Sequence, residues 1–301
     1  MKEQKNIPIV FCDSSLTYLT ESLKSLTDFI LELDYLERFA NQELHIVLSR
    51  SVANKHCLIL GAITPPDSHL FAFLALAHTL KKEKAKKVSA VLPYLAYSRQ
   101  EKQEPQKSQM SALIGSLFMA AGIDEVITFD IHSLAAESLF PMPIYSLSPA
   151  GLFAEELKRI SFVQATIVSP DEGALTRCQE VAKQLNSSSI AWVKKTRSEK
   201  GIAQVELQGC VGEKAVIIDD ILDTGQTLVS CSEKLLEQGA KEIIIMVTHG
   251  LFTGDQWKQL WDLGVTRIYC TNTIPIAKNL LDENPITVLS INTLLVTALI
   301  K

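Results

Sequence analysis

A short apolar run followed by two acids and a Thr/Gly loop, within residues 214–227, constrains the fold of this chain more than any other feature. Ala215 to Ile218 is too short for a helix and rich in β-branched residues, which indicates a strand buried on both faces. Asp219 and Asp220 follow it directly. Open parallel α/β sheets bind ligands beyond the carboxyl ends of their strands, so we expect this acid pair at a binding edge.

A short loop links this strand to an amphipathic segment, Leu228 to Gln238. The loop consists of Asp223, Thr224, Gly225, Gln226 and Thr227. Such a loop offers backbone N–H groups, two hydroxyls and a helix N-terminus to an anion, and the anion it suits is a phosphate. It is not a Walker A loop, because no lysine follows the glycine in the G-K-[ST] arrangement. The plainer alternative is that Asp223 and Thr224 merely begin a helix.

The acid pair and the loop together predict a site for a sugar phosphate. Carboxylates beside a phosphate would repel it, so Asp219 and Asp220 are better suited to hydrogen-bond a diol or to hold a metal ion.

Strand and helix signals alternate along the rest of the chain, which predicts an α/β fold of two similar doubly wound domains with mainly parallel sheets. The chain divides near Pro143, giving domains over residues 1–143 and 144–290. The predicted strands span residues 7–12, 44–48, 57–61, 87–92, 125–129, 165–168, 189–193, 201–207, 215–218, 242–248, 267–270 and 286–290.

The string from Lys214 to Thr227 resembles the ribose-phosphate-binding motif of the phosphoribosyl-diphosphate family, and five further segments match the ribose-phosphate diphosphokinase family in the same order. The five segments are residues 38–43, 92–101, 130–133, 169–171 and 193–198. Enzymes of this family make phosphoribosyl diphosphate from ATP and ribose 5-phosphate. The resemblance implies a phosphoribosyltransferase-like fold, with the last helix, residues 291–301, packed on the first domain.

For ribose 5-phosphate, the resemblance implies that Asp219 and Asp220 bind the ribose hydroxyls. The residues implied around the 5-phosphate are Asp223, Thr224, Gly225, Gln226 and Thr227. Gln226 is a departure, because the synthetases usually carry a second glycine there.

For ATP, three segments carry the resemblance. Phe39, Asn41 and Glu43 are similar to the family's F-x-D/N-x-E strip, which stacks on adenine and reads its edge. Residues 92–101 are similar to P-Y-x-x-Y-x-R-Q-D, and residues 130–132 to D-L-H. The ATP-binding residues implied by these two segments are Arg99, Gln100 and His132. Glu101 replaces the usual aspartate, and most of the basic residues that follow it in the family are missing.

The resemblance also implies a metal and a catalytic segment. His132 and Asp171, the latter in an S-P-D segment, would hold Mg²⁺ with the ATP phosphates. Lys195 and Arg197 match the family's K-x-R, and their cations would neutralise charge on the transferring group.

The expected reaction is transfer of the diphosphoryl group of ATP to the 1-hydroxyl of ribose 5-phosphate. Two alternatives remain: a phosphoribosyltransferase that consumes phosphoribosyl diphosphate, and a non-catalytic regulatory homologue of the synthetase. The resemblance further implies a homo-oligomer built from dimers.

Charge and composition bear on the partners of the protein and on its cellular compartment. A net charge of -5 gives no field that would attract nucleic acid or an anionic membrane. The start is polar and unlike a signal peptide, and no apolar stretch reaches the length that spans a bilayer. The 6 cysteines include no C-x-x-C pair, so we expect reduced thiols and a cytoplasmic protein.

Overall fold

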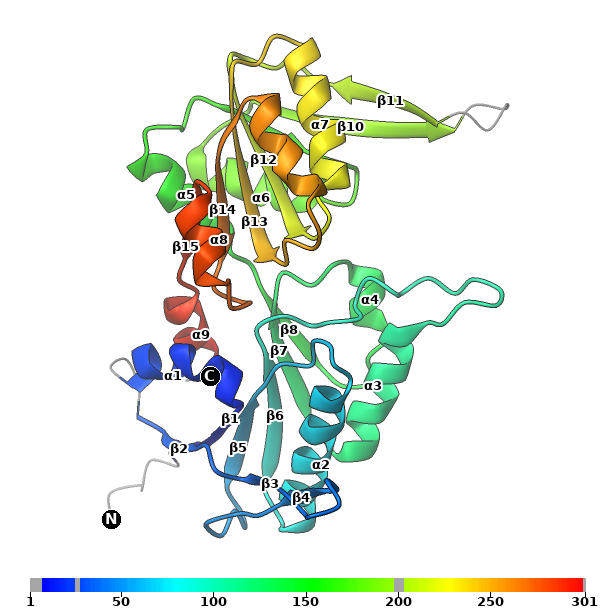
Figure 1. Ribbon diagram of the computed structural model, residues 1–301, viewed down its shortest axis with the longest axis vertical. Coiled ribbons are helices and arrows are strands. Elements are labelled where there is room, and N and C mark those ends of the chain that lie inside the picture. Colours follow the sequence, from blue (N-terminus) through cyan, green and yellow to red (C-terminus); the bar gives the residue numbers. More distant parts are fainter. Residues whose placement is uncertain (1–6, 25–27, 198–202, 300–301) are drawn as a thin grey trace. The chain divides into compact units, whose positions relative to one another are not determined.

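The structure is a computed structural model that describes residues 7–24, 28–197 and 203–299 (Figure 1). It divides into two compact units. The first comprises Met1–Leu147 with Asn292–Lys301, and the second comprises Ser148–Ile291. The fold is α/β with mostly parallel sheets, as predicted.

The first unit contains a 6-stranded sheet in the order β2-β1-β5-β6-β7-β8, in which every neighbouring pair is parallel. Its strands are β1 (Ile9–Cys12), β2 (Ile30–Glu32), β5 (His56–Leu60), β6 (Lys87–Leu92), β7 (Glu125–Phe129) and β8 (Ile144–Leu147). Its helices are η1 (Ser14–Leu16), α1 (Thr17–Lys24), α2 (Ser68–Lys82), α3 (Met110–Ala121), α4 (Leu134–Ser138) and α9 (Asn292–Leu299). Because parallel strands share a carboxyl edge, the segments after β6 and β7 leave the sheet side by side.

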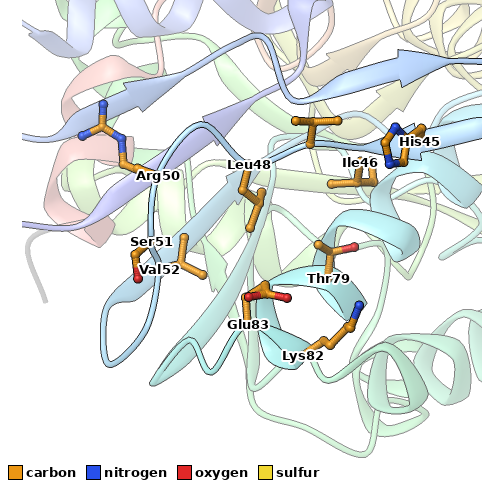
Figure 2. Close-up of a pocket in the computed structure, with 10 residues that line it drawn as sticks. His45, Ile46, Leu48, Arg50, Ser51, Val52, Thr79, Lys82 and Glu83 are labelled. Atoms are coloured by element: carbon orange, nitrogen blue, oxygen red, sulfur yellow. The ribbon is translucent and has the colours of Figure 1, made fainter.

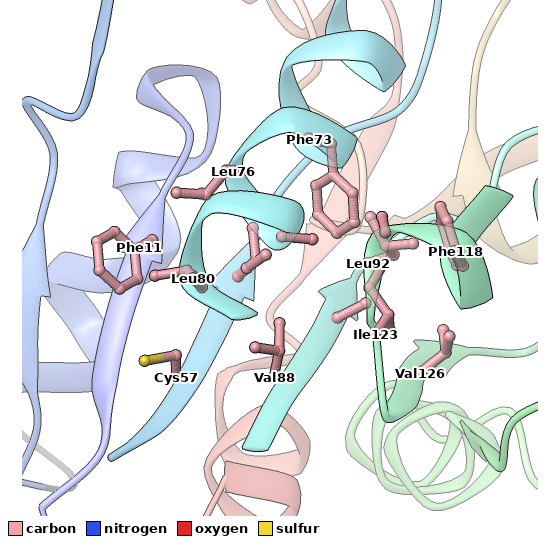
Figure 3. Packing of buried hydrophobic residues seen from close by; sticks show 14 of the residues in the cluster. Phe11, Cys57, Phe73, Leu76, Leu80, Val88, Leu92, Phe118, Ile123 and Val126 are labelled. Atoms are coloured by element: carbon pink, nitrogen blue, oxygen red, sulfur yellow. The ribbon is translucent and has the colours of Figure 1, made fainter. Parts of the chain in front are cut away.

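The core of the first unit lies between this sheet and two helices, α2 and α3 (Figure 3). Phe73 and Leu76 of α2 and Phe118 of α3 meet Val88 and Val126 from the strands. The last helix, α9, belongs to this unit and packs against α1.

A separate hairpin, β3 (Leu36–Arg38) and β4 (Leu44–Ile46), precedes β5. The predicted strand over residues 44–48 is therefore shorter and pairs antiparallel with β3 instead of joining the parallel sheet.

The second unit contains a 7-stranded sheet in the order β11-β10-β9-β12-β13-β14-β15. Its strands are β9 (Thr166–Ser169), β10 (Ile190–Arg197), β11 (Ala203–Gln208), β12 (Lys214–Leu222), β13 (Glu242–Gly250), β14 (Val265–Thr271) and β15 (Ile286–Leu289). Its helices are α5 (Ala150–Arg159), α6 (Leu175–Leu185), α7 (Gln226–Glu237), η2 (Gln256–Leu263) and α8 (Lys278–Glu283). All pairs are parallel except β10 with β11.

Both faces of this sheet are covered, which is why β12 is apolar without alternation. Val216 and Ile218 pack into the cluster formed with α5 and α6, whereas Ala215 and Ile217 pack into the cluster formed with α7 and η2. Successive side chains of a strand point to opposite faces, so an uninterrupted apolar run fills two cores at once.

The division between the units follows Leu147, not residue 143, because β8 pairs in parallel with β7 and completes the first sheet. In the part of the chain that the structure describes, no helix has the length and apolar character needed to cross a bilayer.

Candidate functional site

The acid pair is buried near the carboxyl end of β12. Asp219 and Asp220 are 8% and 4% exposed. The strand continues through both acids to Leu222, beyond the predicted end at Ile218, because its ladder with β13 extends that far. The backbone N–H of Asp220 donates a hydrogen bond to Asp219 Oδ1 at 2.9 Å, which fixes the Asp219 carboxylate.

Two charged side chains from the neighbouring elements surround Asp219. Arg177 of α6 places its Nη1 atom 3.8 Å from Asp219 Oδ1. Asp171 follows β9, the strand next to β12, and its Oδ1 accepts a hydrogen bond from the backbone N–H of Ala174 at 3.1 Å. Sequence reasoning missed Arg177, although an arginine shortly after the S-P-D segment, at the start of a helix, was a visible signal.

Burial raises the pKa of Asp219 well above its usual range, and the negative charge of Asp220 raises it further. Arg177 opposes this rise, and Asp171 adds to it. Without a ligand, the surroundings therefore favour the protonated form of Asp219. A group that donates hydrogen bonds to the carboxylate would favour ionisation.

The loop after β12 leads into the N-terminus of α7. Gly225, with φ 84° and ψ −1°, is the N-cap residue of α7. Gly225 has no side chain with which to cap α7, and the first turn of the helix contains no acidic residue. The first N–H groups of a helix lack intrahelical acceptors, so this end favours an anion. Thr224 and Gln226 are exposed beside it, and Thr227 is half-buried.

Lys195 and Arg197 lie on β10, in the part that pairs with β11 after the ladder with β9 ends at Ser169. The strand predicted to end at residue 193 therefore continues through both residues, because β11 supplies an antiparallel partner (Figure 1). The side chains of residues 195–205, and residues 198–202 entirely, lie outside the described part of the chain, so the predicted roles of Lys195 and Arg197 stay predictions.

In the first unit, the segments carrying Arg99, Gln100 and His132 follow β6 and β7, which are neighbouring parallel strands. The Ser133 hydroxyl donates a hydrogen bond to the Glu101 carboxylate and accepts one from Ala136 N–H as the N-cap of α4. This contact joins the two segments, so the residues on either side of it lie at one edge of the sheet.

The segment around Gln100 is further held by the two residues that precede α3. Ser108 Oγ donates to Gln100 Oε1 at 3.2 Å, and Gln109 Nε2 donates to the Glu101 carbonyl at 2.7 Å. Arg99 and Gln100 are exposed. They are therefore positioned by their neighbours while their own side chains face solvent.

The other predicted ATP-binding residues lie elsewhere in the unit. Phe39 is 51% exposed in the turn of the β3–β4 hairpin, so it is not a core residue. It stacks on His45 with 4.7 Å between ring centroids and 22° between the planes. Asn41 Oδ1 accepts a hydrogen bond from the Glu43 N–H at 3.1 Å, which shapes the turn.

A cavity of about 370 Å³ lies beside this hairpin, and the residues that line it show which part of the unit the hairpin is near (Figure 2). It is lined by β4, by the segment after it, and by the C-terminal end of α2, whose Thr79 and Lys82 lie near the beginning of β6. His45, the stacking partner of Phe39, is part of its lining. The hairpin thus packs near the amino edge of the sheet, and the structure does not bring Phe39, Asn41 and Glu43 together with the carboxyl-edge residues of the same unit.

The two predicted metal ligands lie in different units, His132 in the first and Asp171 in the second. Among the residues that the structure describes, no group of three or more His, Cys, Asp or Glu side chains is arranged to hold a metal ion. Mg²⁺ is commonly held by one or two carboxylates together with substrate phosphates, so a half-buried carboxylate such as Asp171 fits it without a protein cage.

The fold and the strand-end acids define an α/β protein that carries buried carboxylates near the carboxyl edge of a mainly parallel sheet. Residues 9–122 match the N-terminal domain of ribose phosphate pyrophosphokinase, and residues 162–301 match the phosphoribosyl synthetase-associated domain. The chain belongs to the ribose-phosphate pyrophosphokinase family.

Individual relatives are similar in sequence to most of this chain. A ribose-phosphate pyrophosphokinase of Cereibacter sphaeroides is 34% identical over 73% of this chain and 67% of its own length. One from Campylobacter jejuni is 31% identical over 81% of this chain and 80% of its own. The crystal structure of phosphoribosylpyrophosphate synthetase from Mycobacterium smegmatis matches with a TM-score of 0.83 at 26% identity, covering 97% of each chain.

Proposed function

We propose that this chain is a ribose-phosphate pyrophosphokinase. It transfers the diphosphoryl group of ATP to the 1-hydroxyl of ribose 5-phosphate, giving 5-phosphoribosyl 1-diphosphate and AMP. Family membership supports the reaction. The observation that carries it in this chain is the buried acid pair, Asp219 and Asp220, on the strand that leads through a short loop to the N-terminus of α7.

Ribose 5-phosphate binds to the second unit. Asp219 and Asp220 accept hydrogen bonds from the ribose hydroxyls, which favours the ionised pair and lowers the raised pKa of Asp219. The 5-phosphate binds to the N–H groups at the start of α7. The residues around it are Asp223, Thr224, Gly225, Gln226 and Thr227. This arrangement orients the 1-hydroxyl and holds it in place for attack.

ATP binds through Arg99, Gln100 and His132, whose segments the contact between Glu101 and Ser133 holds together. When bound, Mg²⁺ neutralises charge on the ATP phosphates, and Asp171 and His132 would hold it. The 1-hydroxyl attacks the β-phosphorus in line and AMP leaves. Lys195 and Arg197 stabilise the negative charge of the transition state.

The chain works as a homo-oligomer built from dimers. The position of Phe39, Asn41 and Glu43 supports this, because the hairpin lies away from the carboxyl edge of its own unit and exposes its aromatic ring. In a dimer, the strip would contribute to the ATP site of the neighbouring subunit. All 6 cysteines are free thiols, which suits a cytoplasmic enzyme.

Replacing Glu101 by alanine is expected to raise the KM for ATP about 10- to 150-fold, because a hydrogen bond to a charged group contributes roughly 1.5–3 kcal/mol and here holds the His132 segment in place. Glu101→Gln keeps an oxygen acceptor for Ser133 and serves as the matched control, with a KM close to that of the wild type. Steady-state kinetics with ATP varied at saturating ribose 5-phosphate measures both. An unchanged KM in Glu101→Ala would show that the contact does not position the ATP site.

The reaction itself is tested by ³¹P NMR of the wild-type protein incubated with ATP, Mg²⁺ and ribose 5-phosphate. We expect the signals of AMP and of a new diphosphate ester to grow together. ADP in place of AMP would show attack at the γ-phosphorus and refute the proposal. Consumption of added phosphoribosyl diphosphate with a nitrogenous base, without turnover of ATP, would identify a phosphoribosyltransferase.

A further inference from the structure

The segment after β13, residues 251–257, is hydrogen-bonded to the start of the loop of residues 223–227, which is proposed to bind the 5-phosphate. The N–H groups of Leu251 and Phe252 both donate to the Leu222 carbonyl, at 2.8 and 3.1 Å. The N–H of Thr253 donates to the Asp223 carbonyl at 3.0 Å. These hydrogen bonds therefore hold the backbone between the acid pair and Gly225 in place, and they come from a segment far away in the sequence.

The segment ends in Trp257, which lies directly against Gly225. A Cβ atom built on Gly225 would lie 2.7 Å from both Cα and Cβ of Trp257, so the two backbones are in close contact. Trp257 is 1% exposed and belongs to the core shared with α7. Its Nε1–H donates to the Gly254 carbonyl at 2.9 Å, and Phe252 contacts its ring edge-on with 5.1 Å between centroids.

These contacts anchor the indole in the core, and the anchored indole fixes the Trp257 backbone, whose Cα and Cβ atoms limit where Gly225 can lie. Gly225 is the N-cap residue of α7, so its position sets the direction in which the first N–H groups of the helix point. A shift of about 1 Å in a binding group can cost roughly 100-fold in rate.

We propose that Trp257 is a positioning residue for ribose 5-phosphate: it acts through Gly225 and holds the loop in the form that receives the 5-phosphate. The inference rests on the proposed function of the loop. It adds a residue outside the loop, from the start of η2, to the determinants of substrate affinity. Trp257 itself does not touch the substrate.

The experiment compares Trp257→Ala with Trp257→Phe and with Trp261→Ala. Trp261 lies on the same helix and contacts Trp257 edge-on at 6.2 Å between centroids, so its loss also removes aromatic packing from η2, while the atoms nearest to a Cβ on Gly225 all belong to Trp257. For each protein we would measure the KM for ribose 5-phosphate, the KM for ATP, the affinity for ribose 5-phosphate by calorimetry without ATP, and the Tm.

We expect Trp257→Ala to raise the KM and the Kd for ribose 5-phosphate about 10- to 100-fold while the KM for ATP stays within about 2-fold. Trp257→Phe retains most of the ring and should recover most of the affinity. It also keeps the test valid if the alanine variant does not fold. Trp261→Ala should lower the Tm without this change in affinity.

Equal losses for ribose 5-phosphate and ATP, or the same loss in Trp261→Ala, would show that Trp257 is only structural and would overturn the inference. An unchanged Kd in Trp257→Ala would do the same. If the wild-type protein releases no AMP in the presence of ribose 5-phosphate, the proposed function fails instead, and that result is independent of the variants.

Discussion

Gly225→Ala is expected to reduce the affinity for ribose 5-phosphate at least about 100-fold, which is a loss of about 2.7 kcal/mol or more in binding free energy. Two effects add at this position. Gly225 has a φ of 84°, a conformation that costs a residue with a Cβ roughly 1–2 kcal/mol. The new Cβ would also lie 2.7 Å from the Trp257 Cα atom, which belongs to backbone that cannot move aside cheaply.

The matched control is Gly239→Ala at the other end of α7. Gly239 has a similar φ of 89°, but no atom lies within 4 Å of the Cβ that alanine would add. Calorimetric titration with ribose 5-phosphate should show near wild-type affinity for Gly239→Ala and little or no binding for Gly225→Ala. Equal affinities in the two variants would show that the loop is not the phosphate site.

Asp219→Asn is expected to stabilise the protein and to damage its activity. Replacing the carboxylate that accepts hydrogen bonds from the ribose by a neutral amide should cost about 1.5–3 kcal/mol, or roughly 10- to 150-fold in kcat/KM. The stability gain follows from the pKa of Asp219, which burial and the charge of Asp220 raise above the ordinary value of 3.8. Asparagine keeps an oxygen for the Asp220 N–H and carries no charge to bury.

The gain in stability of Asp219→Asn over the wild type should increase with pH. Below about pH 4, Asp219 is protonated in both the folded and unfolded chain and contributes nothing. As pH rises towards the raised pKa, the unfolded chain releases the proton first, so the wild type loses stability. The Tm of Asp219→Asn should therefore exceed that of the wild type by a margin that grows with pH between these limits.

Thermal unfolding of the wild type, Asp219→Asn and Asp262→Asn across this range tests the prediction. Asp262 is exposed in the same unit, so Asp262→Asn serves as the control for the substitution itself. A margin for Asp219→Asn that shrinks as pH rises would show that the folded protein favours the ionised form without ligand.

Much of the second unit could be predicted from the sequence because short, continuous stretches of residues are enough to indicate its buried strands. An uninterrupted apolar run with β-branched residues, bounded by polar turns, predicts a strand buried on both faces, and β12 is such a strand. The predicted ends were less accurate. Strands β12 and β10 both continue beyond the predicted ends, because pairing with β13 and β11 extends their ladders.

The hairpin β3–β4 was missed as a hairpin for a similar reason. Its strands are only three residues each, too short for an alternating pattern to be visible. In the predicted domain boundary, the edge strand β8 was assigned to the wrong side, because its pairing with β7 leaves no mark in its own four residues.

For the candidate site, the motifs predicted which residues gather at the strand ends, but not what holds them. Arg177 reaches Asp219 from α6, and Trp257 reaches Gly225 from η2. Neither contact is encoded by a spacing within one segment, because each depends on how a helix packs on the sheet. The arginine after the S-P-D segment could be noticed in the sequence, but its contact with Asp219, like that of Trp257 with Gly225, is seen only in three dimensions.

The most direct test of the central claim is a coupled assay of AMP released from ATP and Mg²⁺, with and without ribose 5-phosphate, on the wild type and on Lys195→Ala. We expect AMP release by the wild type that requires ribose 5-phosphate and falls at least about 100-fold in Lys195→Ala, since a charge-stabilising group of this kind contributes roughly 3–4 kcal/mol. Absence of AMP from a wild-type protein that still binds ribose 5-phosphate would contradict it, and would identify a non-catalytic homologue.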